Sequence, residues 1–132
     1  MATVKGILVN DGGAPARIIN FTCGEDISAG HALKMLSDGK AMLATALEVI
    51  IGFALTDAAD GTKVSCITGS GVVLNAITDV VLAGDELSVD AAKAGFLDAK
   101  IPYSGGTQAD QIVAVALENN STTNTLTKVM VI

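Results

Sequence analysis

The stretch Asp26-Ile-Ser-Ala-Gly-His-Ala-Leu-Lys-Met35 has a counterpart later in the chain, Asp79-Val-Val-Leu-Ala-Gly-Asp-Glu-Leu-Ser-Val89. Each begins at an aspartate, reaches an Ala-Gly turn and continues into a strand-like run. Each is followed by a second glycine turn, an apolar Ala-Leu strand and a closing Thr-Lys-Val. Such a repeated order is typical of a duplicated supersecondary unit. It predicts two repeated β units, about residues 24–77 and 78–132; the alternative is chance similarity between strands rich in Ala, Gly and Val.

Short runs between glycines predict many strands. Asp38-Gly39 and Asp60-Gly61 are typical of hairpin turns, because glycine accepts a positive φ without steric cost. Apolar residues occupy the odd positions of Ile19–Cys23 and the even positions of Lys63–Cys66, which predicts one face on a core and one in water. Strands covered on both faces are predicted by three nearly continuous apolar runs: Val49–Leu55, Gly71–Ile77 and Ile112–Leu117.

Two Ala-containing segments, Lys40–Ile51 and Leu87–Phe96, fit a helix as well as a strand. Because short strands and turns dominate elsewhere, we expect little helix overall. The predicted fold class is therefore mainly β, a compact β-barrel or sandwich-like (tulip-type) domain. A chain of 132 residues fits one domain, or two small β lobes that share one core.

The composition indicates contacts with other chains. Half of the residues are hydrophobic but only 3% are aromatic, and the mean hydropathy is +0.53. We therefore expect apolar surface to be buried in an oligomer, although an Ala-rich core is the alternative. The net charge is -6, with 8 basic and 14 acidic residues and no basic cluster, so the chain is not expected to bind nucleic acid.

No set of residues predicts catalysis, a cofactor or a metal. His31 is the single histidine and is expected to be exposed or locally bonded at the start of a strand. Cys23 and Cys66 are expected to be small buried side chains rather than a disulfide, and they give no zinc spacing. Residues 57–61 hint at a calcium loop but lack its ligand pattern, so a solvated turn is expected. We expect a protein that is not an enzyme and has no small-molecule substrate.

No membrane contact is expected either. The longest apolar stretch, Ala41–Leu55, is interrupted by Thr45 and Glu48 and is too short to span a bilayer. The N-terminal residues are not expected to form a signal peptide, because only a short apolar stretch precedes Asp11. We therefore expect a protein that is made and used without crossing a membrane by a classical route.

The first 16 residues stand apart from the rest. Thr3–Val9 has strand propensity, and the Asn-Asp-Gly-Gly-Ala-Pro segment that follows breaks the chain. Residues 1–16 are expected to form an arm that adds to the sheet edge of another protein, or else an ordinary first strand of the domain. Residues 17–132 form the β-rich domain, and Pro102–Ala109 is expected to be an exposed loop inserted into its second repeat.

The segment Ile51-Gly-Phe-Ala-Leu-Thr-Asp-Ala-Ala-Asp-Gly-Thr-Lys-Val-Ser-Cys-Ile67, followed by Gly69-Ser-Gly-Val-Val73, resembles tailed-phage capsid decoration (cement, head-stabilising) proteins. So do Ala83-Gly-Asp-Glu-Leu-Ser-Val-Asp90 and Ala114-Val-Ala-Leu-Glu118. The resemblance covers about Gly24 to Ile132 and consists of structural glycines and small apolar residues. It implies a β-rich protein that is made in the host cytoplasm and sits as homotrimers on the outer capsid surface of the virion.

In that family the trimers lock adjacent capsomers of the major capsid protein together, and an N-terminal arm reaches onto the coat. The resemblance implies that the matching capsid-contact arm runs from Thr3 to Arg17 here. The candidate contact residues on it are Thr3, Val4, Lys5, Ile7, Val9 and Arg17.

Two other classes remain open. A different virion surface part, such as a fibre or spike domain, would bind a host glycan, and Tyr103 is the one aromatic candidate for such a site. A small enzyme is the third class, and the missing catalytic residues speak against it.

Overall fold

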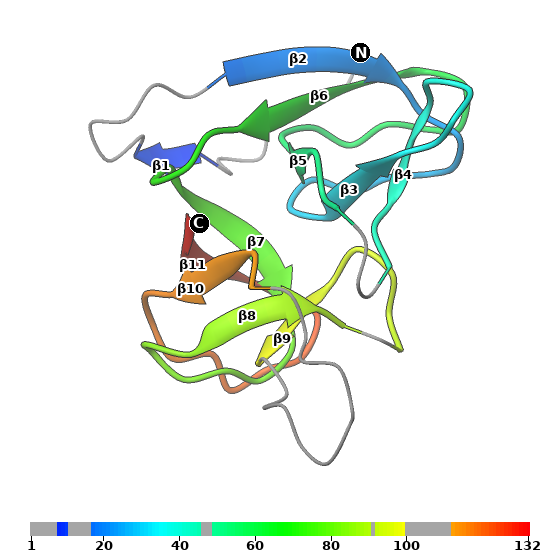
Figure 1. The fold of residues 1–132 in the computed structure, drawn as a ribbon. Coiled ribbons are helices and arrows are strands. Elements are labelled where there is room, and N and C mark those ends of the chain that lie inside the picture. Colours follow the sequence, from blue (N-terminus) through cyan, green and yellow to red (C-terminus); the bar gives the residue numbers. More distant parts are fainter. Residues whose placement is uncertain (1–7, 11–16, 46–48, 91, 100–111) are drawn as a thin grey trace, which may run out of the picture.

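The chain is all-β in the described part of a computed structural model, which comprises residues 8–10, 17–45, 49–90, 92–99 and 112–132. Eleven strands form two sheets, and neither Ala-containing segment is helical where the structure describes it (Figure 1). The predicted fold class, mainly β with two repeated units, is confirmed.

The first unit, unit one, is a five-stranded sheet in the order β2-β6-β5-β3-β4, and every neighbouring pair is antiparallel. A parallel bridge between Cys23 and Ala41 joins the end of β2 to β4. The sheet therefore curls until its two outer strands meet at one end. Its strands are β2 (Arg17–Thr22), β3 (Ala32–Met35), β4 (Ala41–Leu43), β5 (Gly52–Ala54) and β6 (Lys63–Thr68).

The second unit, unit two, repeats this order as β7-β11-β10-β8-β9. A parallel pairing of Thr78 with Leu97 joins β7 to β9, so this sheet also closes on itself. One further strand, β1 (Leu8–Asn10), pairs with β7 antiparallel. The strands of unit two are β7 (Val73–Thr78), β8 (Glu86–Val89), β9 (Leu97–Ala99), β10 (Ala114–Ala116) and β11 (Thr125–Val131).

Equivalent hydrogen bonds establish which residues correspond in the two units. Gly30 N donates to Ala54 O over 2.8 Å, and Gly84 N donates to Ala116 O over 2.8 Å. Both glycines have positive φ, 95° and 89°, which explains why the Ala-Gly turn recurs in the sequence.

The same correspondence holds around the next turn. Ile27 and Ala58 exchange two backbone hydrogen bonds in unit one, and Val81 and Asn120 exchange two in unit two. The structural duplication therefore extends through turns as well as strands.

The strand equivalence divides the chain between β6 and β7. The repeats expected at 24–77 and 78–132 each begin at the turn after the first strand, so they are offset by one strand from the structural units. The Thr-Lys-Val segments are also not equivalent, because Leu55 N donates to Ser65 O whereas Leu117 N donates to Lys128 O. Lys128 therefore corresponds to Ser65, two residues beyond Lys63.

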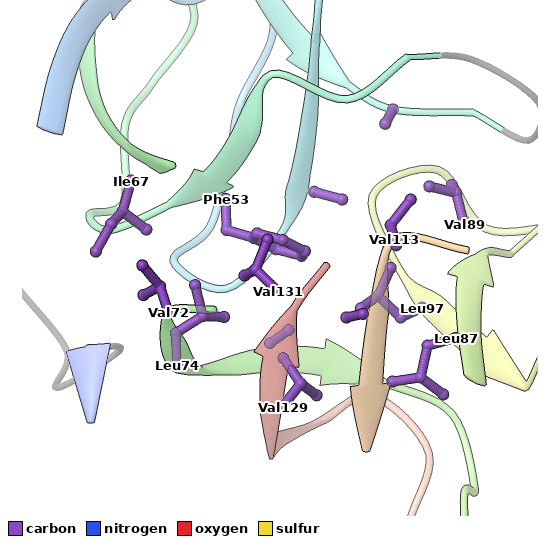
Figure 2. Packing of buried hydrophobic residues seen from close by; sticks show 14 of the residues in the cluster. Phe53, Ile67, Val72, Leu74, Leu87, Val89, Leu97, Val113, Val129 and Val131 are labelled. Atoms are coloured by element: carbon purple, nitrogen blue, oxygen red, sulfur yellow. The ribbon is translucent and has the colours of Figure 1, made fainter. Parts of the chain in front are cut away.

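A single hydrophobic cluster, the shared core, joins the two units. Phe53 and Ile67 from unit one pack with Leu74, Leu87 and other side chains of unit two, and all four are fully buried (Figure 2). Burial of such side chains stabilises a fold by about 1.5–3 kcal/mol each. Because the cluster contains side chains of both units, we expect them to fold together.

A second, smaller cluster lies within unit one and contains Cys23 and Cys66. Both cysteines are free and buried, as expected. Burial raises the pKa of the Cys66 thiol to about 11 and, with smaller effects from Asp60 and Asp26, raises the pKa of Cys23. Both thiols are therefore neutral at neutral pH and pack as small apolar groups.

Gly95 of unit two is an anchor between the units. Its carbonyl accepts from Ala32 N over 2.9 Å, and its amide donates to Ala44 O over 2.7 Å. Its φ is 81°, and a Cβ there would lie 2.9 Å from Leu43 Cδ2 and 3.2 Å from His31 Cγ. Only glycine meets both requirements at this close approach.

Candidate interaction surfaces

Strand β2 is the most exposed strand of unit one. Ile18 and Ile19 point to opposite faces and are 54% and 47% exposed. The alternating pattern predicted Ile19 on the core, and this is wrong. The pattern holds further along, where Phe21 is half-buried and Cys23 fully buried against the unit-one cluster. Ile19 stays exposed because, among the described strands, β2 is an edge strand with β6 alone beside it at this position.

Unit two exposes a different apolar surface, the loop patch, formed by Val80, Leu82 and Leu117. Their exposed fractions are 51%, 62% and 42%. The two loops that carry them are held together by hydrogen bonds from Ala83 N to Asn119 Oδ1 and from Gly84 N to Ala116 O, each 2.8 Å. Scattered apolar side chains are ordinary on a surface, but a group of three on joined loops is a candidate contact site.

The corresponding surface of unit one is polar. Asp26 and Ser28 stand where unit two has Val80 and Leu82, and Leu55, the counterpart of Leu117, is only 8% exposed. The apolar loop patch is therefore specific to unit two.

An open groove of about 190 Å³ lies where the two units meet. Equivalent segments of both units line it: Ile50–Gly52 and Thr68–Gly69 from unit one, and Ile112–Val113 and Val131–Ile132 from unit two. None of the described side chains that line it ionises. Among these side chains, Thr68 and Ser70 supply the hydroxyl groups, and the others are apolar or glycine.

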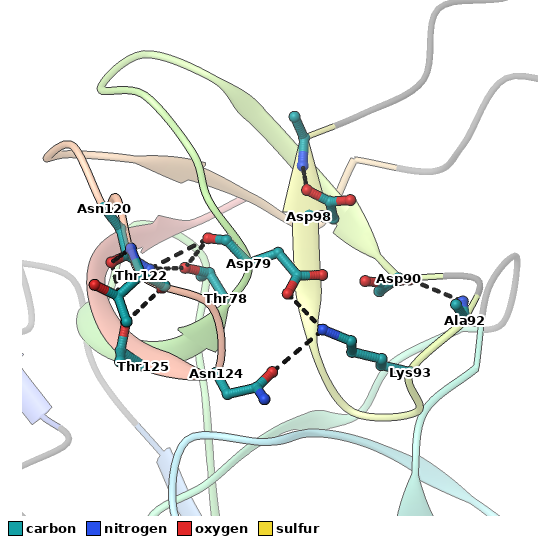
Figure 3. A network of polar contacts seen from close by, with 11 residues as sticks. Thr78, Asp79, Asp90, Ala92, Lys93, Asp98, Asn120, Thr122, Asn124 and Thr125 are labelled. Carbon is teal, nitrogen blue, oxygen red and sulfur yellow. Dashed lines mark hydrogen bonds and ion pairs between the residues drawn. The ribbon is translucent and has the colours of Figure 1, made fainter.

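Three carboxylates gather in unit two, a cluster that the sequence analysis missed. One oxygen from each of Asp79, Asp90 and Asp98 lies within 4.8 Å of the others. Lys93 Nζ lies 2.8 Å from Asp79 Oδ1 and also donates to Asn124 Oδ1 over 3.3 Å (Figure 3). The ammonium group therefore supplies positive charge to the cluster. The carboxylates, Lys93 and Asn124 together link the β7–β8, β8–β9 and β10–β11 connections.

The charges in this cluster are unequal. A hydrogen bond with Asp90, and then one with Lys93, lowers the pKa of Asp79. Burial, followed by the hydrogen bond to Asp79, raises the pKa of Asp90. Asp79 is thus the carboxylate that holds the lysine, and of these two Asp90 is the one that accepts a proton more readily.

A buried hydroxyl pair lies beside this cluster. Thr78 Oγ1 and Thr127 Oγ1 are 2.6 Å apart, and Asn120 Nδ2 donates to Thr78 Oγ1 over 3.0 Å. Unit one has Cys23, Val64 and Ala58 at these three positions, so its interior is apolar there. The hydroxyls bond each other and their neighbours, which places them in a structural role.

His31 and the turn at residues 57–61 are also structural. His31 is buried, its Nδ1 accepts from Ser28 N over 3.3 Å, and its ring centroid lies 5.2 Å from that of Phe96. It is therefore locally bonded, one of the two states expected. Burial lowers its pKa, against smaller opposing effects of Glu25 and Asp57. At the turn, Asp57 Oδ1 accepts a hydrogen bond from Ala29 N over 2.8 Å, so this carboxylate fixes the backbone at Ala29.

The predicted arm residues fall in different places. Thr3, Val4, Lys5 and Ile7 lie outside the described residues, as do Tyr103 and the loop Pro102–Ala109. Val9 lies in β1, which pairs with β7 of unit two. Arg17 is exposed at the start of β2 in unit one. The structure thus assigns Val9 and Arg17 to different sheets.

Within the described residues, no helix is long and apolar enough to cross a membrane.

No protein-family model matches the chain, and no curated protein matches it in sequence. Among solved structures, the fold is similar to that of the head fiber gp8.5 N base of bacteriophage phi29, with a TM-score of 0.66 and 14% sequence identity. The match covers 89% of this chain and 95% of that one. The two chains therefore share their fold across almost their whole length.

Proposed function

We propose that this chain is a virion structural protein that binds the outer surface of a phage capsid as a trimer and cements adjacent capsomers of the major capsid protein. The observation that carries the proposal is the shared fold with a bacteriophage head fiber base over 89% of the chain. Fold alone does not determine function, so the exposed surfaces supply the second line of support.

Those surfaces suit a protein that works by contact. The units share one core and form a single body, which carries exposed apolar side chains at β2 and at the loop patch. A trimer that engages three coat sites at once gains avidity, because each later contact forms at a high effective concentration. We assign the loop patch to the contact between copies, since unit two has apolar side chains there and unit one has polar ones.

Sedimentation with coat shells tests the capsid role. Expanded shells of the encoding phage that lack this protein should bind the purified chain saturably, and bound shells should survive heating or chelation that breaks bare shells. If the chain stays in the supernatant at micromolar concentration, the cement proposal is wrong.

Light scattering tests the trimer. The purified protein should have about three times the 13.3 kDa mass of one chain. Leu82→Lys places a charge in the loop patch and should shift the mass toward one chain, whereas Met35→Lys, at a 36% exposed position of unit one, should not. A monomeric wild-type protein would contradict the trimer.

A second candidate is the base of a head fibre, which the description of the phi29 protein favours. In that case the chain anchors a distal part to the head, and a receptor or host glycan binds further out. Shells with the bound protein should then carry projections in electron micrographs, and added protein should leave shell stability unchanged.

A further inference from the structure

The outer edge of β7 shows how a strand is covered in unit two. Strand β11 pairs with one side of β7 along its whole length. On the other side, β9 pairs at Thr78 and β1 pairs antiparallel opposite Val73 and Leu74. Leu74 is fully buried and Val73 is partly buried. Both edges of β7 are therefore occupied.

Among the described strands, none takes the place of β1 beside the equivalent strand β2. Strand β6 pairs with one side of it, and Ala41 bridges Cys23 on the other, as β9 does for β7. Asn20 pairs with Ser65 as Asn75 pairs with Lys128, so Ile18 and Ile19 correspond to Val73 and Leu74. On the side away from β6, no described strand pairs with Ile18 or Ile19, and these are the two exposed isoleucines of β2.

We propose that an extended segment of the coat protein adds to this bare edge of β2, antiparallel and opposite Ile18 and Ile19, as β1 adds to β7. Main-chain hydrogen bonds would supply the affinity, and apolar side chains on both faces of the added strand would cover the two isoleucines. The identity of this partner rests on the proposed capsid function.

A second copy of the chain fits this edge less well. Each copy has one β1, and β1 is already paired with β7 of its own chain. Two β2 edges that met antiparallel would form a two-fold dimer, which does not produce a trimer. A strand from a different protein meets neither objection.

Charge gives the partner segment a direction. Arg17 is exposed at one end of the edge, and no described carboxylate forms an ion pair with it. The chain as a whole carries a net charge of -6, so a basic residue here is a local exception. We expect a carboxylate on the added strand near Arg17, since opposite charges favour one register and orientation.

The test uses Ile18→Lys and Ile19→Lys, because lysine on an edge strand opposes strand addition. Val49→Lys is the matched control, since Val49 is 74% exposed and lies outside the strands. Wild-type and control proteins should bind the expanded shells equally, and each isoleucine variant should bind at least tenfold more weakly. Thermal midpoints and oligomer mass should not change.

Two further measurements do not depend on the folding of those variants. Arg17→Glu, at an exposed position, should weaken shell binding, and the loss should shrink in high salt. Alternate amides of β2 donate to β6, so the test follows the amides of Ile18 and Asn20, which point away from β6. These two amide hydrogens should exchange freely in the purified protein and become protected on the shell.

Each outcome decides between the proposals. If the wild-type protein does not bind shells, the proposed capsid function and the proposed addition of a coat-protein strand are both wrong. If the isoleucine variants bind as tightly as wild type, only the strand addition at β2 falls. If those variants change the oligomer mass, or if the amides of Ile18 and Asn20 are already protected in the purified protein, the edge is covered by this chain itself, and the proposal is overturned.

Discussion

Units one and two have the same strand order and the same turn hydrogen bonds, yet their interiors differ. Unit one places Cys23, Val64 and Ala58 where unit two places Thr78, Thr127 and Asn120. The backbone pairing at Gly24–Ala41 and at Asp79–Leu97 is the same, with N to O distances of 2.9 Å. The comparison teaches that turns and backbone ladders define this fold, and that side chains can vary as long as buried polar groups are paired.

The outer surfaces differ even more. Unit one has a bare strand edge and a polar turn, whereas unit two has a covered edge and the apolar loop patch. A duplicated unit with one surface for its own copies and another for the coat would provide both contacts from a single small fold.

The largest difference in the free energy of unfolding between equivalent substitutions in the two units is expected in the shared core. Phe53 is fully buried, and its counterpart in unit two, Val115, is partly exposed. Phe53→Ala should lower the free energy of unfolding by about 3–5 kcal/mol, and Val115→Ala by about 1 kcal/mol. Urea unfolding followed by circular dichroism measures both. A single transition in each protein is expected, and a separate transition for each unit would show that the core does not couple them.

Alanine substitution of the two equivalent glycines, Gly30 and Gly84, compares how tightly the same turn is packed in the two units. Gly30→Ala and Gly84→Ala impose the same positive φ on alanine, at a cost of about 1–2 kcal/mol each. At Gly30 the new Cβ would also lie 2.7 Å from Leu126 Cδ2 and 3.0 Å from Ile77 Cγ1, while at Gly84 the space is open. Crowding should add about 1–3 kcal/mol at Gly30 alone. Equal losses in urea unfolding would mean that unit two does not press on this turn.

Replacing both threonines of the buried hydroxyl pair tests whether unit two tolerates the apolar interior that unit one has. Thr78→Val and Thr127→Val should each cost about 1–3 kcal/mol, because each leaves a buried hydroxyl with fewer partners. The double variant should cost less than the sum of the two. A double-mutant cycle in urea measures the coupling, and strictly additive losses would contradict a direct bond between Thr78 and Thr127.

The smallest effect concerns charge. Asp90 has a raised pKa in the fold, so at neutral pH its charge destabilises the native state, and protonation relieves this as pH falls through that pKa. Asp90→Asn keeps the oxygen that accepts from Ala92 N and should stabilise the protein by less than about 1 kcal/mol at pH 7. The gain should vanish in acid. A gain that persists at low pH would show that charge is not its cause.

Much of the fold follows from local sequence. Glycine turns such as Asp38-Gly39 and the three apolar runs predicted the positions of strands correctly, and the Ala-Gly turn identified equivalent positions 30 and 84. The expectation that these runs are covered on both faces was too broad, because Val49 and Leu117 at their ends are exposed. The exposure of Ile19 could not be predicted, because alternation shows which residues share a face of the sheet. It does not show how many strands lie beside β2. The alignment of the last strands of the two units was also wrong. The two Thr-Lys-Val segments are similar in sequence, but the hydrogen bonds place Lys128 at the position that corresponds to Ser65, not to Lys63.

The candidate sites were harder to predict. Asp79 comes from the β7–β8 connection, whereas Asp90 and Lys93 come from the β8–β9 connection, and only the closure of unit two brings them together. The loop patch joins residues from two loops that are distant in sequence. The bare edge of β2 becomes visible only when its counterpart β7 is seen with β1 beside it.

An electron-microscopy map of the encoding phage's particle tests the central claim most directly. Three copies of this fold should sit at three-fold or quasi-three-fold positions on the outer shell, with an additional strand of coat-protein density along β2 beside Ile18 and Ile19. Particles without this fold on the shell would contradict the capsid role, and a bound trimer whose β2 faces solvent would contradict the strand addition.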